Sequence, residues 1–179
     1  MRRRQSVNRE FQEQVASKGD NSFASCFHCL SCGAGCPAVE LMDWRPNQVI
    51  RMIQRGMKKE VLESRTIWIC IGCFNCLDQC PNRVDIPSLM DTLRHMAIEE
   101  GVRVPEPGIL AFHKEFLRQV SNRGRVFEVG LMMRYKLATR SFSQDMGTGV
   151  RMMLKGRFQL TPSRVENPRE FKEKLGGSS

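Results

Sequence analysis

The chain has 179 residues and a mass of 20.6 kDa, enough for one domain with an extension. Hydrophobic residues make up 41% and charged residues 26%, which excludes a disordered chain, and no apolar run approaches the roughly 18 residues that span a bilayer. The formal charge of +9 lies almost entirely in residues 101–179, which carry 15 Lys/Arg and 7 Asp/Glu. Polar residues follow the basic start, where a signal peptide would be apolar, so we expect a soluble cytoplasmic protein without a transmembrane segment.

The first hundred residues show helical periodicity. A short helix over 9–17 would bury Phe11 and Val15, a helix over 46–58 would begin at Pro46, and a helix from Pro87 would end at Gly101. Alternating strand patterns are scarce, whereas a small βαβ-type ferredoxin would need strands beside its cysteines. The sequence therefore predicts a mainly α-helical module over residues 1–104.

All eight cysteines lie between positions 26 and 80, in two runs of identical spacing. Each run reads C-x2-C-x2-C-x3-C-P, and the second follows the first by 44 residues, which indicates an internal duplication. The spacing is that of bacterial two-cluster ferredoxins, in which three cysteines of a run bind one [4Fe-4S] cluster and the fourth binds the other cluster. We therefore predict one cluster on Cys26, Cys29, Cys32 and Cys80, and a second on Cys70, Cys73, Cys76 and Cys36.

Three other interpretations use the same residues. Two four-cysteine zinc sites would suggest a nucleic-acid-binding module, but such sites pair separated C-x2-C knuckles, whereas here four cysteines fall within eleven residues. A disulfide scaffold would need a secretory signal. A radical enzyme that binds one cluster through three cysteines does not account for eight.

The segment 104–108 contains two prolines and a glycine and marks a boundary. Beyond it, residues 105–179 show helical patterns over 109–124, 126–137 and 144–155, with several methionines and a basic balance. These helices would bury little alone. We expect a basic helical extension that packs on the cysteine-bearing module and on another subunit, although a solvated basic face or a methionine-filled core would give the same pattern.

Nothing in the sequence predicts substrate chemistry. His28, His95 and His113 have no nucleophile or carboxylate constellation around them, so we expect no catalytic residue. His28 lies inside the first cysteine run, where it either faces solvent or tunes a cluster. Two clusters without substrate chemistry predict an electron carrier.

The twin cysteine runs on a helical frame resemble the α-helical ferredoxin domain, which also occurs in iron–sulfur subunits of succinate dehydrogenase and fumarate reductase. The whole chain resembles the C subunit of heterodisulfide reductase, through its length and through the stretch Gly124-Arg-Val-Phe-Glu-Val-Gly-Leu-Met-Met-Arg-Tyr-Lys-Leu137 and Lys155-Gly-Arg157.

That resemblance implies an electron-transfer subunit of an oxidoreductase complex, a hetero-oligomer. The chain would relay electrons from a flavin- and iron–sulfur-containing A subunit to a cysteine-rich B subunit, which reduces a disulfide. The alternative is an iron–sulfur subunit of a quinone-linked respiratory or organic-acid oxidoreductase. Neither role involves nucleic acid.

Overall fold

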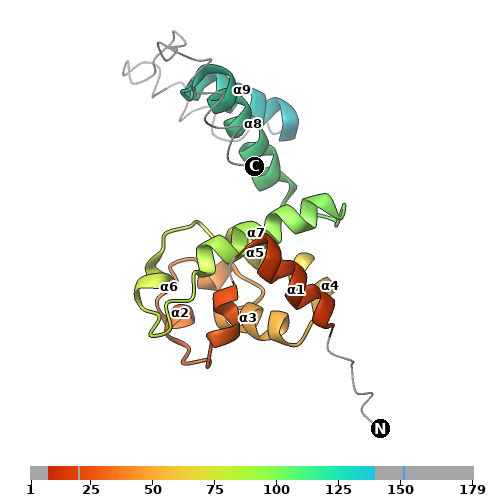
Figure 1. The fold of residues 1–179 in the computed structure, drawn as a ribbon. Coiled ribbons are helices and arrows are strands. Elements are labelled where there is room, and N and C mark those ends of the chain that lie inside the picture. Colours follow the sequence, from red (N-terminus) through yellow and green to blue (C-terminus); the bar gives the residue numbers. More distant parts are fainter. Residues whose placement is uncertain (1–7, 20, 140–150, 152–179) are drawn as a thin grey trace. The chain divides into compact units, whose positions relative to one another are not determined.

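The computed structural model describes residues 8–19, 21–139 and 151, and the chain divides into two units, Met1–Glu106 (unit 1) and Pro107–Ser179 (unit 2). Every regular element in the described residues is helical, as Figure 1 shows, so the prediction of a mainly α fold is confirmed. The division falls within the segment 104–108 that the sequence marks as a boundary.

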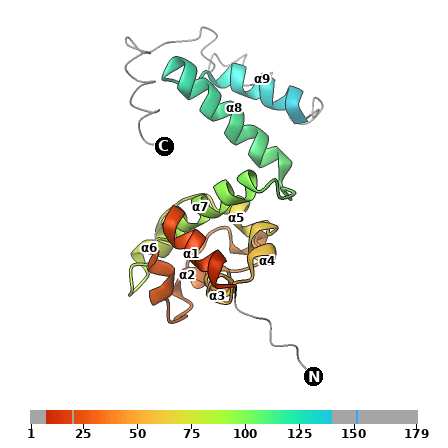
Figure 2. The same ribbon diagram turned by 45° about the vertical axis from the view of Figure 1, so that its right-hand side comes forward.

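Among its described residues, unit 1 contains three helices of nine or more residues and several shorter turns of helix. In chain order the elements are α1 (Arg9–Lys18), η1 (Asn21–Ser25), α2 (Ser31–Ala34), η2 (Val39–Leu41), α3 (Pro46–Gln54), α4 (Lys58–Leu62), α5 (Thr66–Ile69), α6 (Asn75–Asp78) and α7 (Ile86–Glu99). Helix α7 packs against α1, α4, α5 and α6, and Figures 1 and 2 both show it lying along α1. It is therefore the central helix of the unit.

Much of the core of unit 1 comes from one face of each long helix. Helix α1 contributes Phe11 and Val15, both fully buried, so the predicted N-terminal helix and its apolar face are confirmed. The apolar residues of α3 and α7 recur at helical spacing, and burying them is the main favourable contribution to folding. Those with at most 1% exposure are Val49, Ile50, Ile53, Ile86, Leu89, Met90, Leu93, Met96 and Ala97.

Helices α3 and α7 end in the same way. Gly56 and Gly101 adopt left-handed φ angles of 68° and 64°. At the end of α3 the Met57 amide donates to the Met52 carbonyl at 2.9 Å and the Gly56 amide donates to the Ile53 carbonyl at 2.9 Å, which is a Schellman motif. The predicted helix over 46–58 was therefore too long, because the left-handed glycine ends it at Gln54.

Unit 2 contains α8 (Pro107–Arg123) and α9 (Glu128–Thr139), which pack against each other. They agree with the helices predicted over 109–124 and 126–137. The pair buries little: Gln119 is the one buried residue of α8, and Leu131 the one buried residue of α9. The helix predicted over 144–155 lies outside the described residues apart from Arg151.

Candidate functional site

The eight cysteines line two small apolar cavities of unit 1. One cavity contains Cys26, Cys29, Cys32 and Cys80, and its wall is completed by Asn47, Ile50 and Val84 among others. The other cavity contains Cys36, Cys70, Cys73 and Cys76, together with Ala38, Pro46 and Met90 among others. Ile86 lines both, so the cavities adjoin. Each cavity thus gathers three cysteines of one run and the fourth cysteine of the other run.

The two cysteine loops have the same backbone conformation. His28 and Leu30 in the first run have φ angles of 62° and 72°, and the residues 44 positions later, Gly72 and Phe74, have φ angles of 62° and 61°. Left-handed backbone is unfavourable for side chains other than glycine, and it persists where surrounding structure holds it. Each loop then enters a helix of four residues, α2 or α6, and these two helices pack together. The duplication in the sequence is therefore a duplication of structure.

A side chain from the following long helix holds each loop. Gln54 of α3 donates through Nε2 to the Phe23 carbonyl at 2.9 Å and to the Cys26 carbonyl at 3.3 Å. Arg94 of α7 donates through Nε and Nη2 to the carbonyls of Ile67 and Cys70. Ile67 and Cys70 stand 44 positions after Phe23 and Cys26, so the same two carbonyls are bound in each repeat. These contacts fix where the first cysteine of each run lies.

Burial in the cavities disfavours the charged thiolate form of the cysteines and raises the pKa of Cys32 and Cys76. Burial, followed by the neighbouring Cys26 and Cys29, raises the pKa of Cys32 to about 11. Burial, followed by Cys70, Cys32 and Cys73, raises the pKa of Cys76 to about 12. A thiol with such a pKa is protonated at neutral pH, and it loses its proton when a cation binds the sulfur.

Near the outer edge of the first cavity, the Cys29 sulfur lies 3.5 Å from the Ser31 hydroxyl, and this hydrogen bond lowers the pKa of Cys29. The Val84 amide donates to the Cys80 sulfur at 3.3 Å. Hydrogen bonds to sulfur stabilise its anionic form, so both contacts favour thiolates.

The residues at the cavities fit an inorganic cluster. The donor set is eight sulfurs in two groups of four, which is the ligand chemistry of two iron–sulfur clusters. Asn47 lines the first cavity, and its Oδ1 is buried with no hydrogen-bond partner in the protein, so an unsatisfied amide oxygen belongs to a residue of this wall. Gly35 and Gln79 directly follow α2 and α6, and a Cβ atom at Gly35 would come within 2.2 Å of the Gln79 side chain, so the ends of these two helices approach closely.

No three Cys, His, Asp or Glu side chains among residues 8–19, 21–139 and 151 lie close enough together to hold a single metal ion. The helices within these residues also include none that is long and apolar enough to cross a bilayer.

Sequence reasoning identified the cysteines but missed Gln54, Arg94 and Asn47. A signal for the first two exists: counted from the first residue of α3 and of α7, Gln54 and Arg94 occupy the same position. It becomes visible only when both helix starts are known. His28 is half-buried, and its Nε2 lies 2.9 Å from Gln54 Oε1. It therefore helps to orient Gln54, the side chain that holds the cysteine loop to which His28 belongs.

Residues 22–84 match the family model described as a 4Fe-4S dicluster domain. This region contains all eight cysteines, so the predicted cofactors, two [4Fe-4S] clusters, are confirmed and the zinc interpretation is not supported.

Curated proteins that are similar to this chain include C subunits of heterodisulfide reductase, the family that it resembles by its sequence. A Methanothermobacter marburgensis protein, named as the C subunit of an H(2):CoB-CoM heterodisulfide,ferredoxin reductase, is 31% identical over 103 residues, which cover 58% of this chain and 56% of the relative. A Methanosarcina acetivorans protein, named as the C subunit of a Ferredoxin:CoB-CoM heterodisulfide reductase, is 34% identical over 99 residues, 55% of this chain and 38% of the relative. The resemblance to these C subunits is confirmed over about half of the chain, which spans about half the length of the curated relatives it matches.

Proposed function

We propose that this chain, a 4Fe-4S dicluster protein similar to heterodisulfide reductase C subunits, relays electrons between two partner subunits of a heterodisulfide reductase-type complex. The observation that supports this best is the division of the eight cysteines between two adjoining cavities. Two cavities that share a wall residue would bring two redox centres close together, which is the arrangement that a relay needs.

The ligand assignment is part of the proposal. Cys26, Cys29, Cys32 and Cys80 would hold the first-run cluster, and Cys70, Cys73, Cys76 and Cys36 the second-run cluster. When bound, each cluster takes up and releases one electron at a time. The protein contributes the thiolates, an apolar wall that excludes water, and hydrogen bonds at the sulfurs such as the one from the Val84 amide. Because all eight cysteines serve as ligands, the disulfide chemistry would take place on another subunit.

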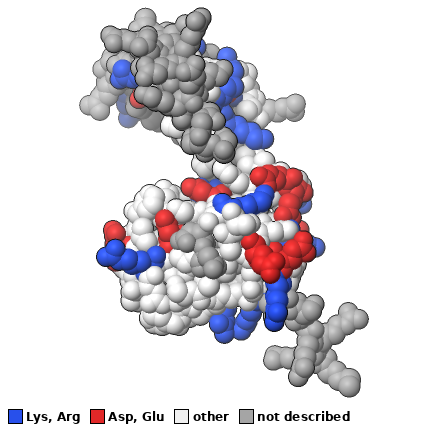
Figure 3. Space-filling view, in the orientation of Figure 1, with Lys and Arg blue, Asp and Glu red and all other residues white. Residues whose placement is uncertain are grey.

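Each cysteine loop carries an exposed apolar rim. Phe27 and Leu30 of the first run are 62% and 57% exposed, and the residues 44 positions later, Ile71 and Phe74, are 69% and 49% exposed. Figure 3 shows one face of unit 1, of which much is uncharged, with charged side chains gathered toward its borders. Exposed apolar side chains beside a redox centre suit contact with another protein. We infer one contact surface for the electron donor and one for the acceptor.

The partners follow from the resemblance. A flavin- and iron–sulfur-containing A subunit would donate electrons at one rim, and a cysteine-rich B subunit would accept them at the other. The relatives are named for the CoB-CoM heterodisulfide, and we propose a disulfide of that class as the terminal substrate of the complex. The proposal includes a cytoplasmic location, where thiolate ligands stay reduced.

Unit 2 has the features of a docking element for such a complex. Phe112, Phe116 and Leu117 of α8 and Met132 and Met133 of α9 are exposed, Leu117 and Met133 by more than 60%. A helix pair that leaves this many apolar side chains in water gains free energy when a partner covers them.

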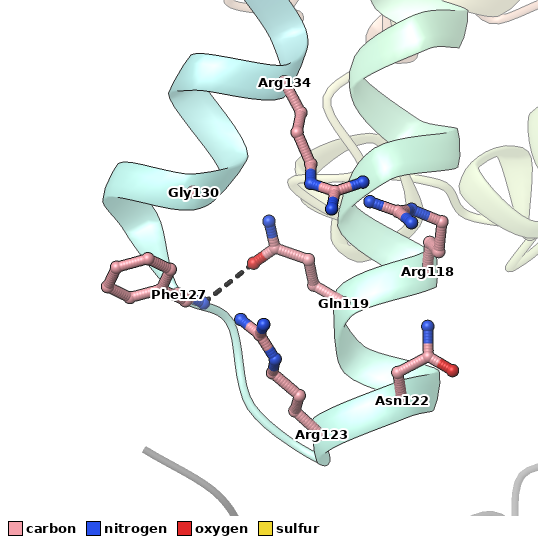
Figure 4. A pocket seen from close by; sticks show the side chains of 7 residues that line it. All are labelled: Arg118, Gln119, Asn122, Arg123, Phe127, Gly130 and Arg134. Atoms are coloured by element: carbon pink, nitrogen blue, oxygen red, sulfur yellow. Dashed lines mark hydrogen bonds between the residues drawn. The ribbon is translucent and has the colours of Figure 1, made fainter. Parts of the chain in front are cut away.

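A pocket of unit 2 adds positive charge to that surface. Figure 4 shows Arg118, Arg123 and Arg134 reaching into the space between α8 and α9. Glu115 accepts from Arg118 at 2.7 Å and lies 3.6 Å from Arg134, while Arg123 lies 5.9 Å from the ring centre of Phe127. No acidic residue is among the described residues that line the pocket, so it suits a carboxylate of the partner.

Anaerobic co-purification with this chain, followed by identification of the bound subunits, tests the proposal. We expect a flavin-binding subunit together with a cysteine-rich subunit. A membrane cytochrome or quinone-reactive subunit in their place would contradict it and favour a respiratory complex.

A matched pair of rim variants tests the relay itself. Phe27→Glu and Ile71→Glu place a charge at equivalent positions of the two loops, and each should slow electron transfer with one partner at least about tenfold while leaving transfer with the other unchanged. Iron and sulfide contents of both variants serve as the control for intact clusters. Equal effects of both variants on the same partner would contradict a two-ended relay.

A further inference from the structure

The two repeats differ in the charge of the side chain that holds each cysteine loop. Gln54 is the ninth residue of α3 and Arg94 the ninth residue of α7, and each donates hydrogen bonds to the carbonyl of the first cysteine in its loop. The contacts are the same in kind, but Gln54 is neutral and Arg94 is a permanent cation. One cysteine loop therefore has a positive charge against its backbone that the other lacks.

The charge on Arg94 is shielded from water more than most surface charges. Its side chain is 13% exposed, and its guanidinium lies between the Ile67 and Cys70 carbonyls. Its counter-ion, Asp91, lies 2.6 Å away but is itself 65% exposed, so solvent screens the carboxylate more than the guanidinium. A net positive field remains at the second cysteine loop.

We propose that Arg94 raises the reduction potential of the second-run cluster above that of the first-run cluster and so sets the direction of electron flow. The inference rests on the ligand assignment proposed above. Reduction adds one electron and makes a cluster more negative, and a nearby fixed cation stabilises the more negative state. One electron then leaves the first-run cluster as one enters the second-run cluster, and no proton moves because the guanidinium stays protonated.

Other groups near the first cavity act against this asymmetry and are weaker. Arg45 and Arg83 belong to the chain around the first-run ligands, but both are exposed, so water screens them. Asn47, the second residue of α3, contributes a buried amide to the wall of the first cavity, whereas the second residue of α7 is Pro87. An amide dipole produces a smaller field than a full charge at similar range. In the second repeat Asp78 of α6 adds a negative charge, but it is exposed and water screens it, so Arg94 dominates the difference between the repeats.

The test is an anaerobic redox titration of the full chain with both clusters loaded, followed by electron paramagnetic resonance. Arg94→Gln gives the second loop the neutral side chain of the first. We expect one of the two potentials to fall, with about a tenfold change in that cluster's reduction equilibrium, equivalent to about 59 mV for one electron. Arg94→Lys keeps the charge and should keep most of the potential.

Two further variants separate charge from structure. Gln54→Arg places a guanidinium on the equivalent carbonyls of the first loop and should raise the other potential. Arg65→Gln removes an arginine that is 48% exposed and paired with Glu106, and it should shift neither potential. Iron and sulfide are measured in every sample. If the unmodified chain did not bind two clusters, its own iron and sulfide contents would show this, separately from any effect of Arg94.

The inference is overturned if Arg94→Gln, carrying two clusters, keeps both potentials. It is also overturned if Arg94→Lys and Arg94→Gln shift the potential equally, because the side chain would then act through structure rather than charge. Failure of both Arg94→Gln and Gln54→Arg to load two clusters would likewise replace a tuning role with a role in assembly.

Discussion

The two cysteine repeats of unit 1 share a backbone but differ in the side chains that support it. Left-handed residues, the four-residue helices α2 and α6, and the carbonyls bound from the following helix all recur at a spacing of 44 residues. The supporting residue is Gln54 in one repeat and Arg94 in the other, and a cavity residue is Asn47 in one and Pro87 in the other. Duplication thus supplies two similar ligand loops, and a few substitutions make their surroundings unequal.

Removing both clusters should produce the largest change, because each repeat depends on them. The helices α2 and α6 have four residues each and cannot persist through their own backbone hydrogen bonds. We expect the free energy of unfolding to fall by at least about 3 kcal/mol in the apoprotein, since binding of ligands to the folded state alone stabilises that state. Anaerobic thermal melts of holo- and apoprotein measure this, and superimposable melts would show that the loops form without clusters.

The glycines that end α3 and α7 provide the next comparison. Gly56 and Gly101 have nearly the same φ, but a Cβ at Gly56 would lie 2.3–2.8 Å from backbone atoms of Asn8, whereas a Cβ at Gly101 meets nothing within 4 Å. Gly101→Ala should cost about 1 kcal/mol for its left-handed backbone alone. Gly56→Ala should cost roughly 3 kcal/mol, because it also displaces the start of α1.

Denaturant unfolding of the two holoproteins measures this difference, with Gly101→Ala as the control for backbone strain. Equal losses in the two variants would mean that Asn8 does not pack against Gly56 in solution.

The smallest effects concern the loops themselves. Gly72 has a φ of 62° and open space around it, so Gly72→Ala should cost about 1 kcal/mol for conformation alone. The equivalent His28 already adopts this conformation. His28→Gly relieves the backbone strain, which stabilises the folded state. It also makes the unfolded chain more flexible and removes the contact with Gln54, and both of these effects destabilise the folded state. We expect His28→Gly to change stability by no more than about 0.5 kcal/mol in either direction. A large loss in that variant, measured by the same unfolding experiment, would show that the His28–Gln54 contact dominates over strain.

Much of this arrangement follows from the sequence. Cysteine spacing predicted the cofactors, and apolar periodicity predicted α1, α7, α8 and α9, because both are local patterns. The end of α3 was misplaced because Met57 continues the apolar face of the helix, while the left-handed Gly56 has already ended it. The roles of Gln54 and Arg94 were missed for another reason: their contacts cross 24 to 31 residues and depend on how α3 and α7 lie over the loops.

The exchange of fourth ligands between the repeats is the central claim, and iron content in two double variants tests it most directly. Cys36→Ser with Cys73→Ser removes two ligands from one cavity, so the chain should keep one cluster, about four iron atoms. Cys36→Ser with Cys29→Ser removes one ligand from each cavity, so the chain should lose both clusters. The reverse result, with iron retained when Cys36 and Cys29 are replaced together, would mean that each run binds its own cluster and would contradict the account.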